Sequence, residues 1–237
     1  MHTKCVSKKN PRWRLVVFDC DGTLVDSQHT IVASMTAAWH AHGLQRPATD
    51  AIRRVIGLPL EVAIARLAST QQGGQVQRLG DAYRKAFFRL QTQRDYHEPL
   101  YPGVHKILCW LEQEGILMGV ATGKGRRGLV TTHDRPGLTS RFITLQTSDR
   151  VRGKPDPDML YQAMDVAGVP PAHTVMVGDT VYDMEMAANA NVDAVGVSWG
   201  YHGSCELTSA GAYAVIDSFD EFIAMFEDMS PTVLGVS

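Results

Sequence analysis

Short apolar runs that alternate with helical patterns are the feature that most restricts the folds open to this chain. The first run, Arg14–Asp19, is rich in β-branched residues and ends at acidic and glycine residues, as a buried strand does where it enters a loop. Because strands that alternate with helices are joined by right-handed crossovers, we predict an α/β fold whose parallel sheet is covered on both faces. The later runs of this kind cover residues 116–122, 142–145, 174–178, 194–198 and 213–216.

The segment from Gln28 to His97 has a different pattern, since it contains no convincing strand. Apolar residues at helical spacing predict four amphipathic helices in it. The segment is far longer than a usual connection between two strands, so an inserted helical lobe explains it better than helices that cover one face of the sheet. We therefore predict a sheet core formed by residues 1–26 and 98–237 and a helical cap domain formed by residues 27–97.

The chain has 237 residues, of which 44% are hydrophobic, and a formal net charge of -2. This is enough apolar material for one large domain or two unequal ones, whereas the near-neutral charge provides no basic face for nucleic acid or an anionic membrane. No run approaches the roughly 20 apolar residues that span a bilayer. The four cysteines are scattered and form no CxxC pair, which is typical of a reduced compartment. We therefore expect a soluble cytoplasmic protein, a monomer or homodimer, without nucleic-acid or membrane partners.

The first chemical signal is the sequence Asp19-Cys20-Asp21-Gly22 at the end of the first run. Two carboxylates two residues apart on an extended segment project to the same side, and Gly22 permits the sharp turn that follows. Such a pair suits a nucleophile beside a proton donor, or two ligands of a hard cation. An acidic turn that caps the next helix is the simpler alternative. It explains two carboxylates at the end of so apolar a strand less well, because burying an unpaired carboxylate is costly.

Three further polar features follow later runs. Thr122 and Gly123 end the second run and offer a hydroxyl and backbone N–H groups to a phosphate. Lys154 lies in a proline-rich segment whose stiff backbone favours a fixed cation. Asp179 ends the fourth run, and Asp183 lies one helical turn further along on the same side. Taken alone, each has an ordinary alternative role as a turn, a solvated lysine or an acid that complements a helix dipole.

The carboxyl ends of parallel strands meet at one edge of a sheet, so we expect these features to form a single site. The carboxylates would repel one another without a cation, and a donor set made only of oxygen atoms suits Mg²⁺. That ion, together with Lys154 and Thr122, is suited to neutralise the charge of a transferring phosphoryl group. The residues therefore predict phosphoryl-transfer chemistry at this edge.

In their order along nearly the whole chain, the four motifs resemble those of the haloacid dehalogenase superfamily, and of its phosphatase branch in particular. The segment from Asp19 to Ser27, with the helical insertion after it, is most similar to the phosphoglycolate-phosphatase-like group. The resemblance implies a Rossmann-like core under a mobile helical cap. It also implies Mg²⁺-dependent hydrolysis of a small-molecule phosphate ester such as phosphoglycolate through a phospho-aspartyl intermediate. The dehalogenase branch fits less well, because it lacks the second aspartate that this chain has at Asp21.

The same resemblance implies roles for the first two aspartates. Asp19 is the nucleophile and a ligand of Mg²⁺. Asp21 is the general acid that protonates the leaving oxygen and then the base that activates water, and its backbone carbonyl also binds the metal.

The remaining motif residues receive roles from the resemblance as well. Thr122 and the Gly123 amide hold phosphate oxygens, and Lys154 stabilises negative charge near the nucleophile. Asp179 is the acidic metal ligand. Asp183 supports the metal or Lys154 from just behind.

Two alternatives to a phosphatase remain open at this stage. A hexose-phosphate mutase uses the same aspartyl chemistry but returns the phosphoryl group to a sugar, so it does not release free phosphate in the steady state. A non-catalytic module that only binds Mg²⁺ and phosphate has little use for the acid/base pair of Asp19 and Asp21. A lid as large as the predicted cap further predicts small esters rather than phosphoproteins as substrates.

Arg53 and Arg54 are candidates in the cap for binding a substrate carboxylate or a second phosphate. Arginines of this kind more often lie on the exterior of a helix. His202, which follows the fifth run, is expected to be a histidine of a surface loop.

Overall fold

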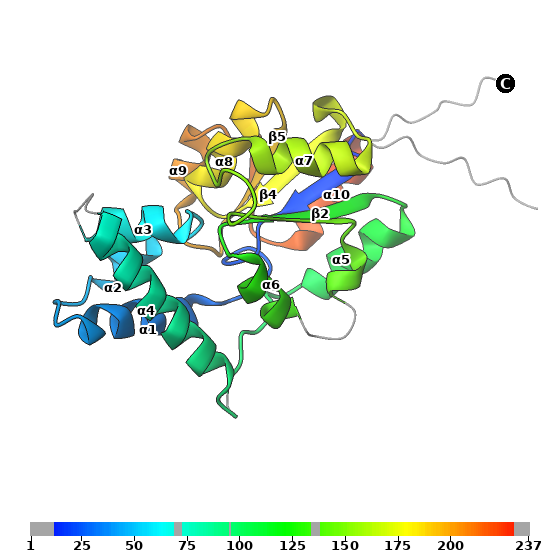
Figure 1. The fold of residues 1–237 in the computed structure, drawn as a ribbon. Coiled ribbons are helices and arrows are strands. Elements are labelled where there is room, and N and C mark those ends of the chain that lie inside the picture. The colour runs from blue at the N-terminus through cyan, green and yellow to red at the C-terminus, as the bar shows by residue number, and fades with distance from the viewer. Residues whose placement is uncertain (1–11, 69–72, 95, 134–137, 230–237) are drawn as a thin grey trace, which may run out of the picture.

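The computed structural model describes residues 12–68, 73–94, 96–133 and 138–229 (Figure 1), so residues 1–11 of the predicted core lie outside the described part. Six strands of this part form one parallel sheet in the order β3-β2-β1-β4-β5-β6. Each predicted apolar run forms a strand. The strands are β1 (Leu15–Phe18), β2 (Leu117–Thr122), β3 (Thr144–Thr147), β4 (Thr174–Gly178), β5 (Asp193–Val197) and β6 (Ala214–Ile216).

The third strand begins two residues later than expected. Phe142 leaves a 3₁₀ turn (Thr139–Arg141) and is buried in the core, where its ring makes an edge contact with Phe18 at a centroid distance of 6.5 Å. Strand pairing starts only at the next residue, where the Ile143 N–H donates to the Met118 carbonyl at 2.9 Å.

Helices cover both faces of the sheet, which explains why the central strand is apolar throughout. Val16 and Phe18 of β1 belong to the hydrophobic cluster on one face, and Leu15 and Val17 to the cluster on the other, as the pleat of a strand requires. Burial of side chains of this size contributes roughly 1.5–3 kcal/mol each. The first face is covered by α5 (Val104–Gln113), α6 (Arg126–His133) and α10 (Phe219–Met229), and the second by α7 (Asp158–Ala167), α8 (Val181–Asn189) and α9 (Ser204–Ser209).

Four helices lie outside the sheet and its covering layers, between β1 and α5 in the chain (Figure 1). They pack around a hydrophobic core of their own, to which Ile31, Ile52, Ile64 and Leu79 each contribute from a different helix. The predicted fold class, a parallel α/β core with an inserted helical cap, is thereby confirmed, while the exact division at residues 27 and 97 stays a prediction. The four helices are α1 (Gln28–Ala41), α2 (Thr49–Arg53), α3 (Leu60–Leu67) and α4 (Gly73–Gln91).

The two segments that join this helical lobe to the sheet lie side by side. Val25 and Leu100 form an antiparallel bridge. The Asp26 N–H donates to the Pro99 carbonyl at 2.8 Å, and the Tyr101 N–H donates to the Leu24 carbonyl at 3.0 Å. The lobe therefore leaves the sheet and returns to it at adjacent points. None of the described helices is both long and apolar enough to cross a membrane.

Strand order positions the functional site. From β1 the chain goes to β2 and β3 on one side and later to β4, β5 and β6 on the other. In open α/β sheets such a change of direction leaves a crevice at the carboxyl ends of the two central strands. Here those strands are β1 and β4, which end at Phe18 and Gly178, immediately before Asp19 and Asp179.

Candidate active site

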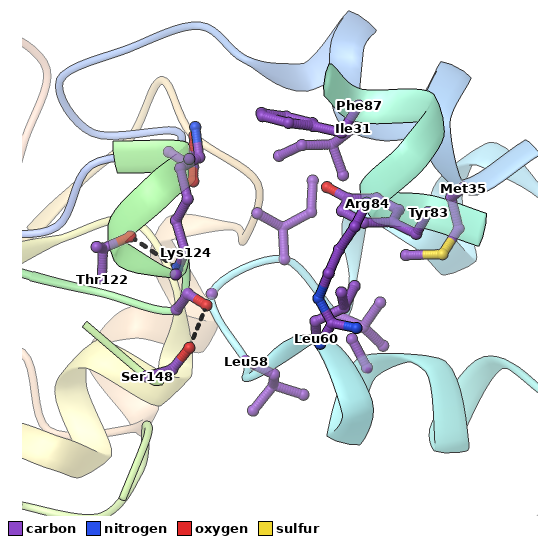
Figure 2. Close-up of a pocket in the computed structure, with 18 of the residues that line it drawn as sticks. Ile31, Met35, Leu58, Leu60, Tyr83, Arg84, Phe87, Thr122, Lys124 and Ser148 are labelled. Atoms are coloured by element: carbon purple, nitrogen blue, oxygen red, sulfur yellow. Dashed lines mark hydrogen bonds and ion pairs between the residues drawn. The ribbon is translucent and has the colours of Figure 1, made fainter. Parts of the chain in front are cut away.

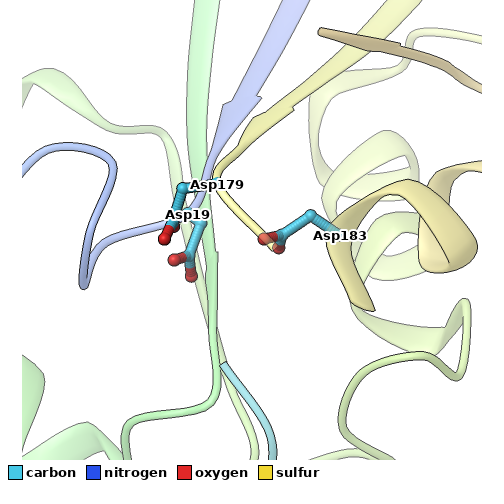
Figure 3. Close-up of side chains that lie close together, drawn as sticks. All are labelled: Asp19, Asp179 and Asp183. Carbon is cyan, nitrogen blue, oxygen red and sulfur yellow. The ribbon is translucent and has the colours of Figure 1, made fainter. Parts of the chain in front are cut away.

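Three buried aspartates meet at this edge of the sheet (Figure 3). Asp19 and Asp179 directly follow β1 and β4, and Asp183 lies in the first turn of α8. One carboxylate oxygen of each lies within 4.8 Å of the others. The sequence motifs, which are far apart in the chain, thus form one cluster, as predicted.

Two of the three carboxylates are fixed by nearby donors. Asp179 accepts hydrogen bonds from the Thr23 hydroxyl and the Tyr201 N–H, each at 2.9 Å. Asp183 accepts from the Thr180 N–H at 3.0 Å and from its hydroxyl at 2.7 Å, which completes a capping box at the start of α8. Asp183 is therefore both a helix-capping acid and a member of the cluster. Its support of a metal stays a prediction.

Lys154 supplies the cation of the cluster. It is 2% exposed and pairs with Asp19 and, at 2.6 Å, with Asp183. Burial by itself would lower the pKa of Lys154, but the charges of Asp183 and Asp19 outweigh it and raise that pKa, so the ammonium stays charged.

Two of the three aspartates, Asp19 and Asp179, have raised pKa values. Burial raises the pKa of Asp19 to about 7, against the opposing effect of Lys154 and with a further rise from Asp183. Burial and the charges of Asp19 and Asp183 likewise raise the pKa of Asp179 well above its usual range. The single positive charge of Lys154 does not balance the negative charge that three ionised carboxylates would place in this cluster.

The cluster fits a divalent cation. One oxygen of Asp19, Oδ2, is buried and accepts no hydrogen bond from the described part of the chain, and such an atom is costly unless it binds something. A cation between Asp19, Asp179 and Asp183 would also relieve their repulsion. Because the donors are all carboxylate oxygens, the site suits a hard ion such as Mg²⁺.

Asp21 lies beside this cluster and has different partners. Its Oδ1 accepts a hydrogen bond from the Ser27 hydroxyl at 2.5 Å and pairs with Lys124 Nζ at 2.8 Å. The Asp21 carboxylate is not one of the three clustered acids, which is compatible with the predicted acid/base role. The proposed contact of its backbone carbonyl with a metal stays a prediction.

Lys124 is a residue of this site to which sequence reasoning assigned no role. Its side chain is 9% exposed, and its Nζ lies 5.3 Å from the centroid of the Phe87 ring, on the lobe. Burial tends to lower its pKa, but Asp21 raises it, so the ammonium remains charged. A lysine between two glycines directly after a strand is the available signal, but its spacing does not match that of a P-loop.

Thr122 and Gly123 form part of a cavity of about 460 Å³ between the sheet edge and the lobe, and Asp19 and Asp21 also line it (Figure 2). The Thr122 hydroxyl accepts a hydrogen bond from the Lys124 N–H at 3.1 Å, and the Ser148 hydroxyl donates to the Gly123 carbonyl at 2.6 Å. A β-carbon on Gly123 would lie 2.5 Å from the Gly57 carbonyl oxygen of the lobe. The predicted phosphate-binding loop is thus at the junction of lobe and core.

The two candidate arginines of the cap lie away from this cavity. Arg53 donates to Gln28 Oε1 at 2.8 and 2.5 Å, and Arg54 forms two hydrogen bonds with Glu206, at 2.7 and 2.6 Å. Neither belongs to the residues that line the cavity. Both occupy the helix-exterior position that was their alternative, and their role in substrate binding stays a prediction that this geometry does not favour.

The expectation for His202 is wrong. The residue is 3% exposed, and its Nδ1 accepts a hydrogen bond from the Val181 N–H at 3.1 Å, at the start of α8. Its ring packs against Tyr182, and burial lowers its pKa. The loop directly after β5 returns across the sheet edge, where the His202 N–H donates to the Asp179 carbonyl at 3.2 Å. Of residues 198–203 in this loop, His202 alone is buried, because its ring lies against the start of α8.

Known proteins resemble this chain along most of its length. A model of the haloacid dehalogenase-like hydrolase family matches residues 16–197. The chain is 36% identical over 214 residues to a Dickeya dadantii protein named "Probable phosphatase IndB", which covers 88% of this chain and 91% of that protein. It is 29% identical over 224 residues to a phosphoglycolate phosphatase of Pseudomonas savastanoi pv. phaseolicola, with 93% and 82% covered.

A solved structure leads to the same family. The structure of a hydrolase from Pseudomonas syringae matches this chain with a TM-score of 0.81 and a sequence identity of 28%. The match covers 92% of this chain and 100% of the other. The chain therefore belongs to the haloacid dehalogenase-like hydrolase family, on the phosphatase side that its four motifs predicted.

Proposed function

We propose that this protein is a Mg²⁺-dependent phosphatase that hydrolyses a small-molecule phosphate monoester through a phospho-aspartyl intermediate on Asp19. The observation that carries the proposal is the position of Asp19 and Asp21. Both line one cavity, but Asp19 is held by Lys154 and the acidic cluster, whereas Asp21 is held by Ser27 and Lys124. A nucleophile and a separate proton carrier are the two groups that such a reaction needs.

In the first half of the reaction, a carboxylate oxygen of Asp19 attacks the phosphorus atom. A bond forms between that oxygen and phosphorus while the bond from phosphorus to the ester oxygen breaks, and Asp21 gives its proton to the departing alkoxide. In the second half, a water molecule loses a proton to Asp21 and attacks the same phosphorus. The aspartyl ester then breaks, which releases inorganic phosphate and restores Asp19.

The other residues stabilise charge on the transferring group. Lys154 is a buried ammonium beside Asp19, and Thr122 and the Gly123 amide, which line the cavity, are the groups proposed to hold phosphoryl oxygens. Asp19, Asp179 and Asp183 are the side chains that would hold a Mg²⁺ ion. When bound, that ion supplies positive charge for the phosphoryl oxygens.

The direct test of this proposal is phosphate release from p-nitrophenyl phosphate by protein treated with EDTA and then supplied with Mg²⁺ or with NaCl of the same ionic strength. Multiple-turnover release of free phosphate that depends on Mg²⁺ is the expected result. A mutase would transfer the phosphoryl group to a sugar phosphate acceptor instead, and a binding module would give no turnover at all.

Mg²⁺ is also expected to raise the thermal unfolding midpoint, because it relieves repulsion between three buried carboxylates. At a concentration about 100 times its Kd, a ligand specific to the folded state adds about 2.7 kcal/mol, which corresponds to a rise of roughly 5–10 °C for a chain of this size. Differential scanning fluorimetry with the NaCl control measures it. An equal midpoint in EDTA and in Mg²⁺ would argue against the metal site.

Gly123→Ala is expected to lower kcat/KM by about 100-fold, because a displacement of the order of 1 Å at a reaction site has an effect of this size. The new β-carbon would lie 2.5 and 2.8 Å from the carbonyl oxygens of Gly57 and Leu58, so the lobe must move away from the core. Gly125→Ala is the matched control, since its β-carbon would lie 3.5 Å from Asp149, an ordinary contact. Equal kcat/KM values for the two variants would contradict this reading of the lobe contact.

The compartment and partners belong to the same proposal. A small phosphate ester is the proposed partner, and the cytoplasm is the proposed location. Within the described part of the chain, Cys20, Cys109 and Cys205 form no disulfide, which agrees with a reducing environment.

A further inference from the structure

The part of the cavity that the lobe contributes is largely apolar. Among the residues that line it are Ile31 and Met35 of α1, Leu58 of the loop before α3 and Phe87 of α4 (Figure 2). The catalytic side of the same cavity is lined by Asp19, Thr122 and their neighbours. The cavity is therefore polar where the phosphate is proposed to bind and apolar where the rest of the substrate must lie.

Aromatic rings on α4 form one wall of the apolar part. Tyr83 and Phe87, four residues apart on the same helix face, have ring centroids 5.9 Å apart and nearly parallel planes, at 21°. Phe88 follows at a centroid distance of 6.1 Å from Phe87, with its plane at 83°. A flat ligand group can stack against a wall of this kind, with a gain beyond the burial of its area.

The aromatic wall lies on the side from which the leaving group departs. The Phe87 ring centroid is 5.3 Å from Lys124 Nζ, and that atom is 2.8 Å from Asp21 Oδ1. In the proposed mechanism Asp21 protonates the leaving oxygen. A carbon skeleton attached to that oxygen would thus lie in the same cavity as Phe87 and within reach of its ring.

The cations that line the cavity already have partners. Arg84 pairs with Glu61 and, at 3.2 Å, with Asp81. Lys124 pairs with Asp21, and the Arg127 guanidinium lies over the Phe88 ring, 4.2 Å from its centroid. A carboxylate on the substrate would have to compete with these contacts, so the cavity is poorly suited to a short anionic skeleton such as glycolate.

On the basis of the proposed phosphatase function, we infer that the natural substrate is a phosphate monoester whose alcohol part carries a flat, uncharged, largely apolar ring. The volume of about 460 Å³ leaves room for such a ring beyond the phosphate. Tyr83 and Phe87 are the specificity-determining residues. This inference keeps the proposed class of small phosphate esters but departs from phosphoglycolate, the ester that the resemblance implies.

The test compares three esters that all lose a primary alkoxide: ethyl phosphate, 2-phenylethyl phosphate and 2-phosphoglycolate, each with Mg²⁺. Even one extra methylene in an apolar pocket changes kcat/KM by about 10- to 200-fold, so 2-phenylethyl phosphate is expected to exceed ethyl phosphate by about 100-fold. It is also expected to exceed 2-phosphoglycolate. Because the leaving oxygen is a primary alkoxide in all three, the comparison reports mainly the fit of the rest of the molecule.

Variants locate the preference. Phe87→Ala is expected to reduce the ratio of the kcat/KM values for 2-phenylethyl and ethyl phosphate by about 10-fold or more. The ratio is measured on one preparation, so a partly unfolded variant does not distort it, and Phe87→Leu provides a smaller change in case the alanine variant does not fold. Tyr161→Ala is the control, since Tyr161 is an exposed aromatic residue on α7 outside the cavity; its ratio should equal that of the wild type.

The outcomes separate the two proposals. A ring preference that falls in the Phe87 variants supports the inference. Hydrolysis of all three esters with 2-phosphoglycolate fastest, or with no ring preference, overturns it and leaves the phosphatase proposal intact. No hydrolysis of any ester by folded, Mg²⁺-loaded protein overturns the phosphatase proposal, and the inference with it.

Discussion

Asp19→Asn is expected to abolish phosphate release, with a fall in kcat of about 10⁴-fold or more, the size of effect seen when a catalytic nucleophile is removed. Asparagine has nearly the same shape, but its amide is a very poor nucleophile towards phosphorus. The protein should remain folded, because Lys154 keeps its pair with Asp183 at 2.6 Å. Phosphate release in Mg²⁺ and the unfolding midpoint in EDTA are the two measurements.

The midpoint distinguishes a chemical effect from a structural one. The pKa of Asp19 is raised to about 7, so its ionisation at neutral pH opposes folding, and a neutral side chain there should keep or raise the midpoint in EDTA. Asp220→Asn removes the same charge from an exposed pair with Lys106 and serves as the control. If Asp19→Asn retained more than about 1% of the wild-type kcat, Asp19 could not be the nucleophile.

Lys154→Met is expected to reduce the free energy of unfolding by about 3–5 kcal/mol, since it leaves buried carboxylates without their cation. The effect should be largest in EDTA at pH 8. Lys106→Met is the matched control, because Lys106 pairs with Asp220 at 2.7 Å but has a side chain that is 62% exposed. Exposed pairs contribute about 0–1 kcal/mol. Urea unfolding of the wild type and the two variants measures both losses in the free energy of unfolding. Equal losses in the two variants would contradict the view that the charges around Lys154 are buried from water.

The loss in Lys154→Met should shrink as the pH falls. A carboxyl whose folded-state pKa is raised stabilises the fold below its unfolded pKa, and this contribution is lost as the pH rises through the folded pKa. For Asp19 these values are 3.8 and about 7. At pH 5 Asp19 is therefore mostly protonated in the folded protein, less charge is left unpaired, and the variant should lie closer to the wild type than at pH 8.

The sheet could be predicted because its physical cause is local. Strands covered on both faces read as continuous apolar runs, and β4 (Thr174–Gly178) and β1 have a buried residue at every position. In a parallel sheet the carboxyl ends of these strands lie at the same edge. For that reason residue types and their order were enough to predict that Asp19, Asp179 and Lys154 share one site. The geometry of that cluster agrees with the prediction, while the roles of its members await the experiments above.

The rest of the cavity could not be predicted, because it depends on how the lobe packs against the core. Phe87 and Arg84 belong to the apolar stripe and the polar flank of one helix. Nothing in that pattern indicates that both line a cavity with Lys124 of the core, or that Phe87 contacts Lys124. The same limit applies to Arg54, whose partner Glu206 lies more than a hundred positions further along the chain. Contacts between units are long-range, and helical periodicity does not encode them.

The bridge between Val25 and Leu100 has a consequence for the history of such enzymes. Because the two ends of the insertion stay adjacent, the strand ends that carry Asp19 and Asp179 can keep their positions when the insertion changes, and loop-closure cost grows only slowly with length. The intervening helices could therefore be replaced while the sheet still presents Asp19 and Lys154 for their proposed chemistry. The sheet would then carry the reaction that related proteins share, and the insertion would carry their substrate specificity.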